Sequence, residues 1–118
     1  RALLPQLREA RGRIVFVSSG AGLRGVAGHT VYAASKHALM GLAHSLLEEE
    51  RDHGVQVSTV SPGAIRTDMR RRDIGAALTR ADEFHIEPAS LARTIRALLE
   101  APRDLLVSDV VVRPQRER

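Results

Sequence analysis

The pattern of hydrophobic and polar positions changes period several times along this chain, in a regular order. Continuous apolar runs rich in β-branched residues occupy residues 13–18 and 55–60, and they predict strands buried on both faces. A third run, at 105–112, predicts another strand. Between these runs, apolar residues recur at helical spacing over residues 31–51 and from Pro88 to Pro102. This alternation predicts an α/β fold with a parallel sheet and crossover helices on its faces.

Glycine and proline residues mark the boundaries of the predicted elements. Gly12 stands where a helix over residues 2–11 is expected to stop, and Gly54 breaks the longest helix. Residues 19–28 form a loop with many glycines, which let a backbone come close to a neighbour. Residues 64–87 combine many charges with a weak hydrophobic pattern, and we interpret this loop as a mobile segment.

Length and composition limit the class of protein. With 118 residues, 43% of them hydrophobic, the chain can bury a modest core and reads as one globular unit or part of one. The absence of cysteine excludes disulfides, thiol nucleophiles and zinc–thiolate sites, and the five histidines lack metal-ligand spacing, so no metal is expected. The chain opens on Arg1 without a leader or a membrane-spanning run, which predicts a cytoplasmic protein.

The basic charge does not by itself indicate a nucleic-acid partner. The net charge is +4, but the basic residues are scattered and only three aromatic residues are available for base stacking. The densest basic cluster, at residues 70–72, is flanked by Asp68 and Asp73, and we interpret it as a solvated loop. The acidic run at 48–50 is likewise expected to be a solvated helix end. We therefore expect neither a nucleic acid nor a membrane as partner.

The only tyrosine and the only lysine of the chain lie four residues apart, as Tyr32 and Lys36. The other seventeen basic residues are arginines, so a lysine at this place indicates a site where a guanidinium is unsuitable. Four residues is one helical step, which puts both side chains on one face. A phenol ordinarily holds its proton up to about pH 10, and a neighbouring ammonium favours the phenolate. The pair therefore suits general acid–base catalysis, although a half-buried tyrosine beside a solvated lysine is the ordinary alternative.

Several of the distinctive residues are predicted to gather at one edge of the sheet. In parallel sheets, ligands bind outside the carboxyl ends of the strands. Ser19 follows the first predicted strand, and Pro62 and Gly63 follow the second. Tyr32 and Lys36 open the helix that runs back from the first of these ends. The glycines of the 19–28 loop do not open a helix directly and so do not form a dinucleotide fingerprint; we interpret them as turn residues beside the site.

This set of motifs resembles the short-chain dehydrogenase/reductase family. The strand ending in Ser18-Ser19, the serine thirteen residues before Tyr32, the Tyr-x-x-x-Lys helix, the Pro62–Thr67 turn and the closing apolar strand occur in the family order and spacing. The resemblance implies a partial Rossmann-like, doubly wound parallel sheet of three strands. It also implies an NAD(P)-dependent oxidoreductase that interconverts a small-molecule alcohol and a carbonyl by hydride transfer.

The resemblance also implies roles for individual residues. Ser19 would hold the substrate oxygen, and Tyr32 would act as general acid or base and also contact the cofactor. Lys36 would both tune the phenol and bind the nicotinamide ribose. The nicotinamide would be bordered by Pro62, Gly63, Ile65 and Thr67, of which Ile65 would use its backbone and Thr67 its hydroxyl. Residues 68–87 would correspond to the substrate-covering loop. The ending at 108–114 is similar to NADP-preferring members, which favours NADP over NAD.

The resemblance covers the whole chain but only the second half of the family domain. The glycine-rich first turn and the cofactor selector of the family have no counterpart here, and the chain contains no asparagine to match the catalytic one. We therefore interpret residues 1–118 as the C-terminal catalytic half of a domain, without its dinucleotide-binding half. The alternative is an inactive fragment that acts at most as an interaction or dimerisation module. The helix from Val31 to Arg51, which pairs subunits in this family, would be the contact surface of a homo-oligomer.

Overall fold

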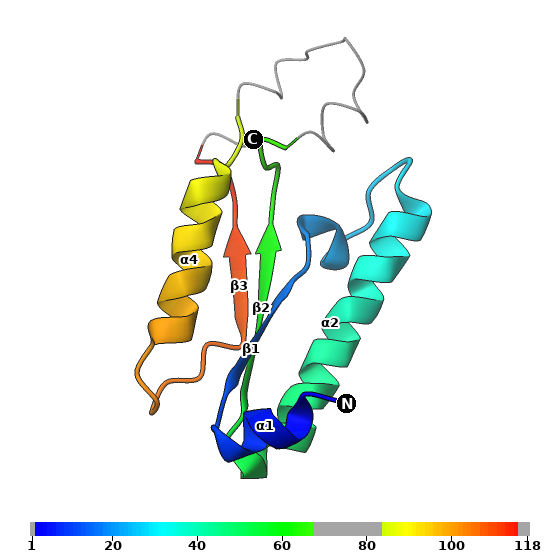
Figure 1. The fold of residues 1–118 in the computed structure, drawn as a ribbon. Helices are drawn as coiled ribbons and strands as arrows, with labels where there is room; N and C mark the ends of the chain where they lie inside the picture. Colours follow the sequence, from blue (N-terminus) through cyan, green and yellow to red (C-terminus); the bar gives the residue numbers. More distant parts are fainter. Residues whose placement is uncertain (1, 68–83, 116–118) are drawn as a thin grey trace.

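A three-stranded parallel sheet organises the computed structural model, which describes residues 2–67 and 84–115 (Figure 1). The strands are β1 (Arg13–Val17), β2 (Gln56–Pro62) and β3 (Asp109–Val112), in the order β1-β2-β3. Val17 pairs with Val60, and Pro62 pairs with Val112. The predicted α/β fold with a parallel sheet is thereby confirmed.

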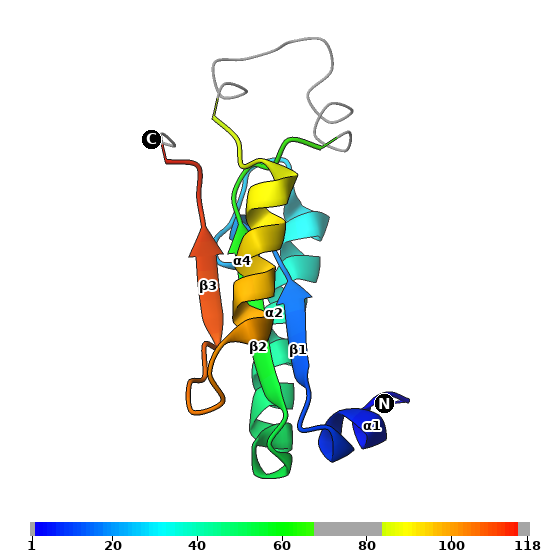
Figure 2. The same cartoon turned by 60° about the vertical axis from the view of Figure 1, so that its left-hand side comes forward.

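Two long helices cover opposite faces of this sheet (Figures 1 and 2). The helix α2 (Thr30–Glu50) packs on one face through a core of Ala43, Leu47 and Val57. The helix α4 (Pro88–Glu100) covers the other face, where Leu91 packs with Val60 and Ile86. Both helices run back from the carboxyl ends of the strands, as crossovers between parallel strands require.

The helices begin and end close to the predicted positions. A short helix, α1 (Leu4–Glu9), precedes β1. The main chain leaves α2 through a 3₁₀ turn at Arg51–His53 and then through Gly54, whose φ of 71° is the left-handed conformation that glycine adopts readily. Pro88 occupies the first turn of α4. A backbone N–H at this position has no acceptor within the helix, so the helix loses no hydrogen bond when proline lacks this group.

The third strand is shorter than the hydrophobic run predicts, because it begins at Asp109 and not at Leu105. Before Ser108, side chains of β2 and not its backbone donate to the carbonyls of this segment. The Gln56 amide donates to the Leu105 carbonyl at 2.9 Å, and the Ser58 hydroxyl donates to the Val107 carbonyl at 2.7 Å. The hydrophobic pattern of a segment does not indicate whether its carbonyls will accept hydrogen bonds from backbone or from side-chain donors.

The prediction that residues 13–18 form a strand buried on both faces is wrong for the described structure. Residues 13–16 are half-buried, and Val17 is 42% exposed, because β1 is one of the two outer strands. The central strand β2 is buried over most of its length, as predicted. The loop that follows β1 also contains a short 3₁₀ helix, Gly20–Gly22, which the sequence pattern did not reveal.

The acidic end of α2 is not wholly solvated, because Glu50 is buried with 1% of its surface exposed. Arg8 of α1 donates to both oxygens of this carboxylate, from Nε and from Nη2, each at 2.7 Å. The hydrogen bonds from Arg8 hold the pKa of Glu50 below its ordinary value of 4.5. A bidentate guanidinium therefore explains why one of three consecutive glutamates can be buried.

The Arg8–Glu50 pair predicts a pH dependence of stability. Because the folded-state pKa of Glu50 is lowered, its contribution is present in full above pH 4.5 and is lost as the pH falls through the folded value. Between pH 5 and pH 3, the melting temperature of the native protein should fall more steeply than that of Glu50→Gln. Calorimetry on both proteins, with the exposed neighbour variant Glu49→Gln as control, measures this difference. Parallel melting curves for the native protein and Glu50→Gln would contradict the assignment.

The predicted loop over 64–87 lies mostly outside the described residues, and so does the basic cluster at 70–72. The described ends of this segment are joined by a parallel bridge between Ile65 and Ile86. In the described ranges, no helix combines the length and hydrophobicity needed to cross a bilayer. The same ranges hold no group of three or more His, Asp or Glu side chains placed to bind a metal ion.

Candidate active site

The carboxyl ends of the three strands meet at one edge of the sheet, where α2 begins (Figure 1). The backbone contacts continue beyond the strands at this edge. Ser18 N–H donates to the Val60 carbonyl, and Gly63 N–H donates to the Val112 carbonyl, both at 2.7 Å. The predicted edge is therefore formed by ordered backbone, with the first turns of α2 beside it.

Tyr32 and Lys36 contact each other on α2, as their spacing predicts. The Lys36 ammonium lies 5.7 Å from the centroid of the Tyr32 ring. The same ammonium donates to the carbonyl of Val17, the last residue of β1, at 3.3 Å. Tyr32 is half-buried, and its hydroxyl makes no hydrogen bond with any residue that the structure describes. The lone lysine thus links the phenol to the carboxyl end of β1.

Local contacts fix the start of α2 against the end of β1. Ala33 is buried, and its N–H donates to the His29 carbonyl at 2.7 Å. Ser18, also buried, donates from its hydroxyl to the Lys36 carbonyl at 3.4 Å. These contacts determine the position of the Lys36 backbone, from which the ammonium reaches Val17.

Gly22 allows the 3₁₀ helix to approach α2 closely. A Cβ atom at this position would lie 2.7 Å from Ser18 Oγ and 3.0 Å from the Lys36 carbonyl oxygen. Such distances are shorter than van der Waals contact, so any side chain would push the two segments apart. A Cβ atom at Gly25 would have no atom within 4 Å. Close approach is therefore a property of Gly22 and not of the glycine-rich loop as a whole.

Ser19 lies at the same edge, and its hydroxyl takes part in a local cap. Its Oγ accepts a hydrogen bond from Ala21 N–H at 3.2 Å, while its backbone is extended. The hydroxyl hydrogen has no acceptor in the described part of the chain, so the group can still donate. No hydrogen bond joins Ser19 to Tyr32 within those residues. The structure thus brings Tyr32 and Lys36 into contact and places Ser19 two residues beyond the carbonyl that Lys36 binds.

The predicted cofactor-binding turn begins at the same edge. Pro62 is buried at the end of β2, and a Cβ atom on Gly20 would lie 3.8 Å from its carbonyl oxygen, so this turn adjoins the residues after β1. The bridge to Ile86 uses the backbone of the residues on either side of Ile65, which directs the polar backbone groups of Ile65 away from Ile86. Thr67 is exposed and is the last described residue of this segment.

Sequence reasoning did not identify three features of this site: the Val17 carbonyl that receives Lys36, the close approach at Gly22, and the packing of His29 against Tyr32. The His29 ring packs edge-on against the Tyr32 ring, with 6.3 Å between centroids and 68° between planes. Its position three residues before Tyr32 is one helical step, which is the signal that could have indicated this contact. The other two features depend on tertiary contacts, for which the sequence carries no local signal.

Comparison with known proteins identifies the family of this chain. A sequence model described as short chain dehydrogenase matches residues 1–76, which is more than half of the chain. The chain belongs to the short chain dehydrogenase family. It is also 36% identical to the dehydrogenase/reductase SDR family protein 7-like of Drosophila melanogaster, over 93% of this chain and 36% of that relative. The chain thus spans well under half the length of this curated relative.

Solved structures similar to this chain confirm its Rossmann-type fold. An alcohol dehydrogenase from the archaeon Thermococcus sibiricus, complexed with 5-hydroxy-NADP, has a TM-score of 0.82 and 23% identity; 99% of this chain matches 48% of it. A 4-hydroxyisoleucine dehydrogenase complexed with NADH has a TM-score of 0.81 and 25% identity; 97% of this chain matches 51% of it. The chain therefore corresponds to about half of each of these enzymes.

Proposed function

We propose that this chain is the C-terminal catalytic part of an NAD(P)-dependent oxidoreductase that interconverts an alcohol and a carbonyl. The observation that carries the proposal is the position of the Lys36 ammonium, between the Tyr32 ring and the Val17 carbonyl at the ligand-binding edge. Membership of the short chain dehydrogenase family supports the reaction class. The outer position of β1 and its half-buried residues support further strands beside it in a longer protein.

The proposed chemistry of this chain is proton transfer at the Tyr32 hydroxyl. During carbonyl reduction, the phenol donates its proton to the substrate oxygen; during alcohol oxidation, the phenolate takes that proton back. The Lys36 ammonium stabilises the phenolate that remains after donation, because an opposite charge nearby favours the charged form. Arginine would be a poor replacement for Lys36, since its broad, planar group does not act as a compact point charge.

Ser19 and the edge backbone supply the remaining polar groups of the proposed site. The free hydrogen of the Ser19 hydroxyl is suited to bind and polarise the substrate oxygen. An ammonium has three donors, and within the described residues only Val17 receives one, so Lys36 retains donors for ribose hydroxyls. The backbone groups of Ile65 and the exposed hydroxyl of Thr67 are suited to bind a carboxamide. A bound nicotinamide would supply the hydride, which no side chain can deliver.

The identity of the cofactor is proposed from two observations. Two similar structures are complexed with 5-hydroxy-NADP and with NADH, which supports a nicotinamide cofactor for this chain without separating NADP from NAD. The similarity of residues 108–114 to NADP-preferring family members favours NADP over NAD as the proposed cofactor. The substrate is proposed only as a small carbonyl compound or alcohol.

Titration with NADPH tests the proposal. The full-length protein should bind NADPH saturably, as measured by nicotinamide fluorescence. The 118-residue chain alone should show no saturable binding, because it lacks a glycine-rich pyrophosphate cradle. Lys36→Ala should weaken binding to the full-length protein, while Arg24→Ala, an exposed change in the neighbouring loop, should not. If the full-length protein bound neither NADPH nor NADH, the proposal would be wrong.

A second candidate function is an interaction module, and the outward face of α2 favours it. Val31 is 84% exposed and Leu42 is 57% exposed. With Ala34 and Ala38, which are also exposed, they form an apolar stripe three turns long. A second copy of the same helix would bury this stripe and form a homo-oligomer through Val31 to Arg51. This dimerisation would be the remaining function of the 118-residue chain if it binds no cofactor, and analytical ultracentrifugation measures it.

A further inference from the structure

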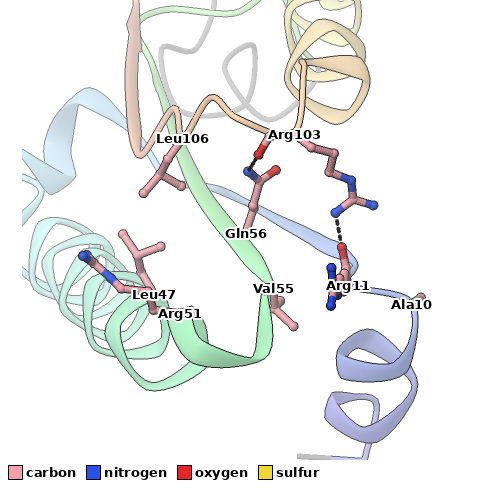
Figure 3. A pocket seen from close by; sticks show the side chains of 9 residues that line it. Ala10, Arg11, Leu47, Arg51, Val55, Gln56, Arg103 and Leu106 are labelled. Atoms are coloured by element: carbon pink, nitrogen blue, oxygen red, sulfur yellow. Dashed lines mark hydrogen bonds between the residues drawn. The ribbon is translucent and has the colours of Figure 1, made fainter.

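A cavity lies at the opposite end of the sheet from the Tyr32–Lys36 pair. Its volume is about 470 Å³, within the range of roughly 300–1,000 Å³ that is typical of small-molecule sites. The walls come from the end of α2, the start of β2 and the segments that precede β1 and β3 (Figure 3). We call it the basal cavity, lined by Ala10, Arg11, Leu47, Arg51, Gly54, Val55, Gln56, Arg103 and Leu106.

One side of the basal cavity carries two guanidinium groups without carboxylate partners. Arg103 donates from Nη1 to the backbone carbonyl of Arg11, which brings the two arginines together (Figure 3). Neither forms an ion pair with a carboxylate in residues 2–67 or 84–115. The third arginine of the lining, Arg51, is instead paired with Glu48 at 2.6 Å. Unpaired guanidinium groups at a cavity attract an oxyanion and can bind it through two parallel hydrogen bonds.

The other side of the basal cavity carries three apolar side chains, beside which lies Arg51, the arginine that is paired with Glu48 (Figure 3). Leu47 and Val55 are buried in its wall, and Leu106 is 48% exposed. Figure 3 shows Leu47 and Leu106 on the side away from Arg11 and Arg103. An alkyl group placed between these side chains would remove apolar surface from water. The cavity is therefore suited to a molecule with an anionic head and an apolar body.

The segment that carries Arg103 and Leu106 is held in place before any ligand binds. The Gln56 amide nitrogen donates to the carbonyls of Arg103 and Leu105, at 3.2 and 2.9 Å. The oxygen of the same amide accepts from Arg13 Nε at 2.6 Å. A wall fixed in this way binds a ligand without the entropic cost of ordering the loop.

We propose that the basal cavity binds a small amphipathic anion, a carboxylate or phosphate monoester on an alkyl chain. Arg11 and Arg103 bind the oxyanion, and Leu47, Val55 and Leu106 contact the alkyl chain. The proposal does not depend on the oxidoreductase assignment, because none of these residues belongs to the Tyr32 site. It adds a binding site at the end of the sheet opposite to the catalytic edge.

Calorimetric titration of the purified protein with decanoate tests this site without any variant. Decanoate should bind saturably and at least about tenfold more tightly than decanol, which lacks the charge. Each added methylene should tighten binding by up to about fourfold, so acetate should bind far more weakly. A parallel titration with decyl phosphate and inorganic phosphate shows which oxyanion is preferred, and tight binding of either alkyl anion supports the site. Equal binding of decanol and decanoate would overturn it.

Three arginine variants locate the bound anion. Arg11→Gln and Arg103→Gln should each weaken decanoate binding about tenfold, because each removes a charge-assisted hydrogen bond. Arg93→Gln removes the same charge from the exposed surface of α4, where the Arg93 side chain donates a hydrogen bond to Ser90, and should leave the affinity unchanged. Circular dichroism confirms that each variant is folded. An equal loss of affinity in Arg93→Gln and Arg103→Gln would show that only net charge matters, and would refute the assigned site.

Discussion

Tyr32→Phe is expected to lower kcat for NADPH-dependent carbonyl reduction by the full-length protein by about 10²–10⁴-fold, the usual contribution of a positioned general acid. The change removes one hydroxyl and keeps the half-buried ring. Because that hydroxyl bonds to no described residue, the fold should not depend on it. Turnover should therefore fall while the melting temperature and the affinity for NADPH stay nearly constant.

Ser35→Ala is the matched control for this variant. It also removes one hydroxyl from the first turns of α2, where Ser35 Oγ donates to the Tyr32 carbonyl at 2.7 Å. This group has no role in the proposed proton transfer, and Ser35 is exposed, so kcat should change little. If Tyr32→Phe kept its activity within tenfold of the native protein, or if Ser35→Ala lost as much, the assignment of Tyr32 as general acid would be wrong.

Gly22→Ala is expected to reduce both stability and activity. Its new methyl group would lie 2.7 Å from Ser18 Oγ and 3.0 Å from the Lys36 carbonyl oxygen. Relief of this overlap must move the 3₁₀ helix away from α2, and overpacking of this kind costs about 1–3 kcal/mol. The same displacement shifts Lys36 relative to the Val17 carbonyl, and a misplacement of about 1 Å can cost roughly 10²-fold in rate. Chemical denaturation and steady-state kinetics measure the two effects.

Gly25→Ala provides the control, since its methyl group would meet no atom within 4 Å. This variant should keep both stability and kcat. Adding Ser18→Ala to Gly22→Ala removes the closest contact and should restore part of the lost stability, while the contact with the Lys36 carbonyl remains. Equal stability losses in Gly22→Ala and Gly25→Ala would mean that the cause is loop stiffness and not the approach to α2.

The order of the elements and the main contact of the site could be predicted from the sequence because both depend on local periodicity. The change from β-branched runs to helical spacing defined the three strands and the two long helices. One helical step placed Tyr32 beside Lys36, as the structure confirms. The rule that ligands bind at the carboxyl ends of parallel strands placed Ser19 and Pro62 at the same edge as this pair.

The remaining features depend on partners that lie far away in the sequence. Glu50 is buried because Arg8, 42 residues earlier, binds both of its oxygens, and three consecutive glutamates show no sign of this. The start of β3 depends on whether the side chains of Gln56 and Ser58 occupy the carbonyls of the preceding segment. A central strand and an outer strand can also have the same apolar sequence pattern, so the exposure of β1 could not be predicted.

The length of α2 keeps its two ends electrically separate. Tyr32 lies near one end and Leu47 borders the basal cavity near the other, about 22 Å away at 1.5 Å per residue. That separation is more than twice the screening length of roughly 8–10 Å in physiological salt. The charge of an anion held by Arg11 and Arg103 would therefore be screened from the Tyr32 site, and only a rigid shift of the whole helix could carry a signal from one end to the other.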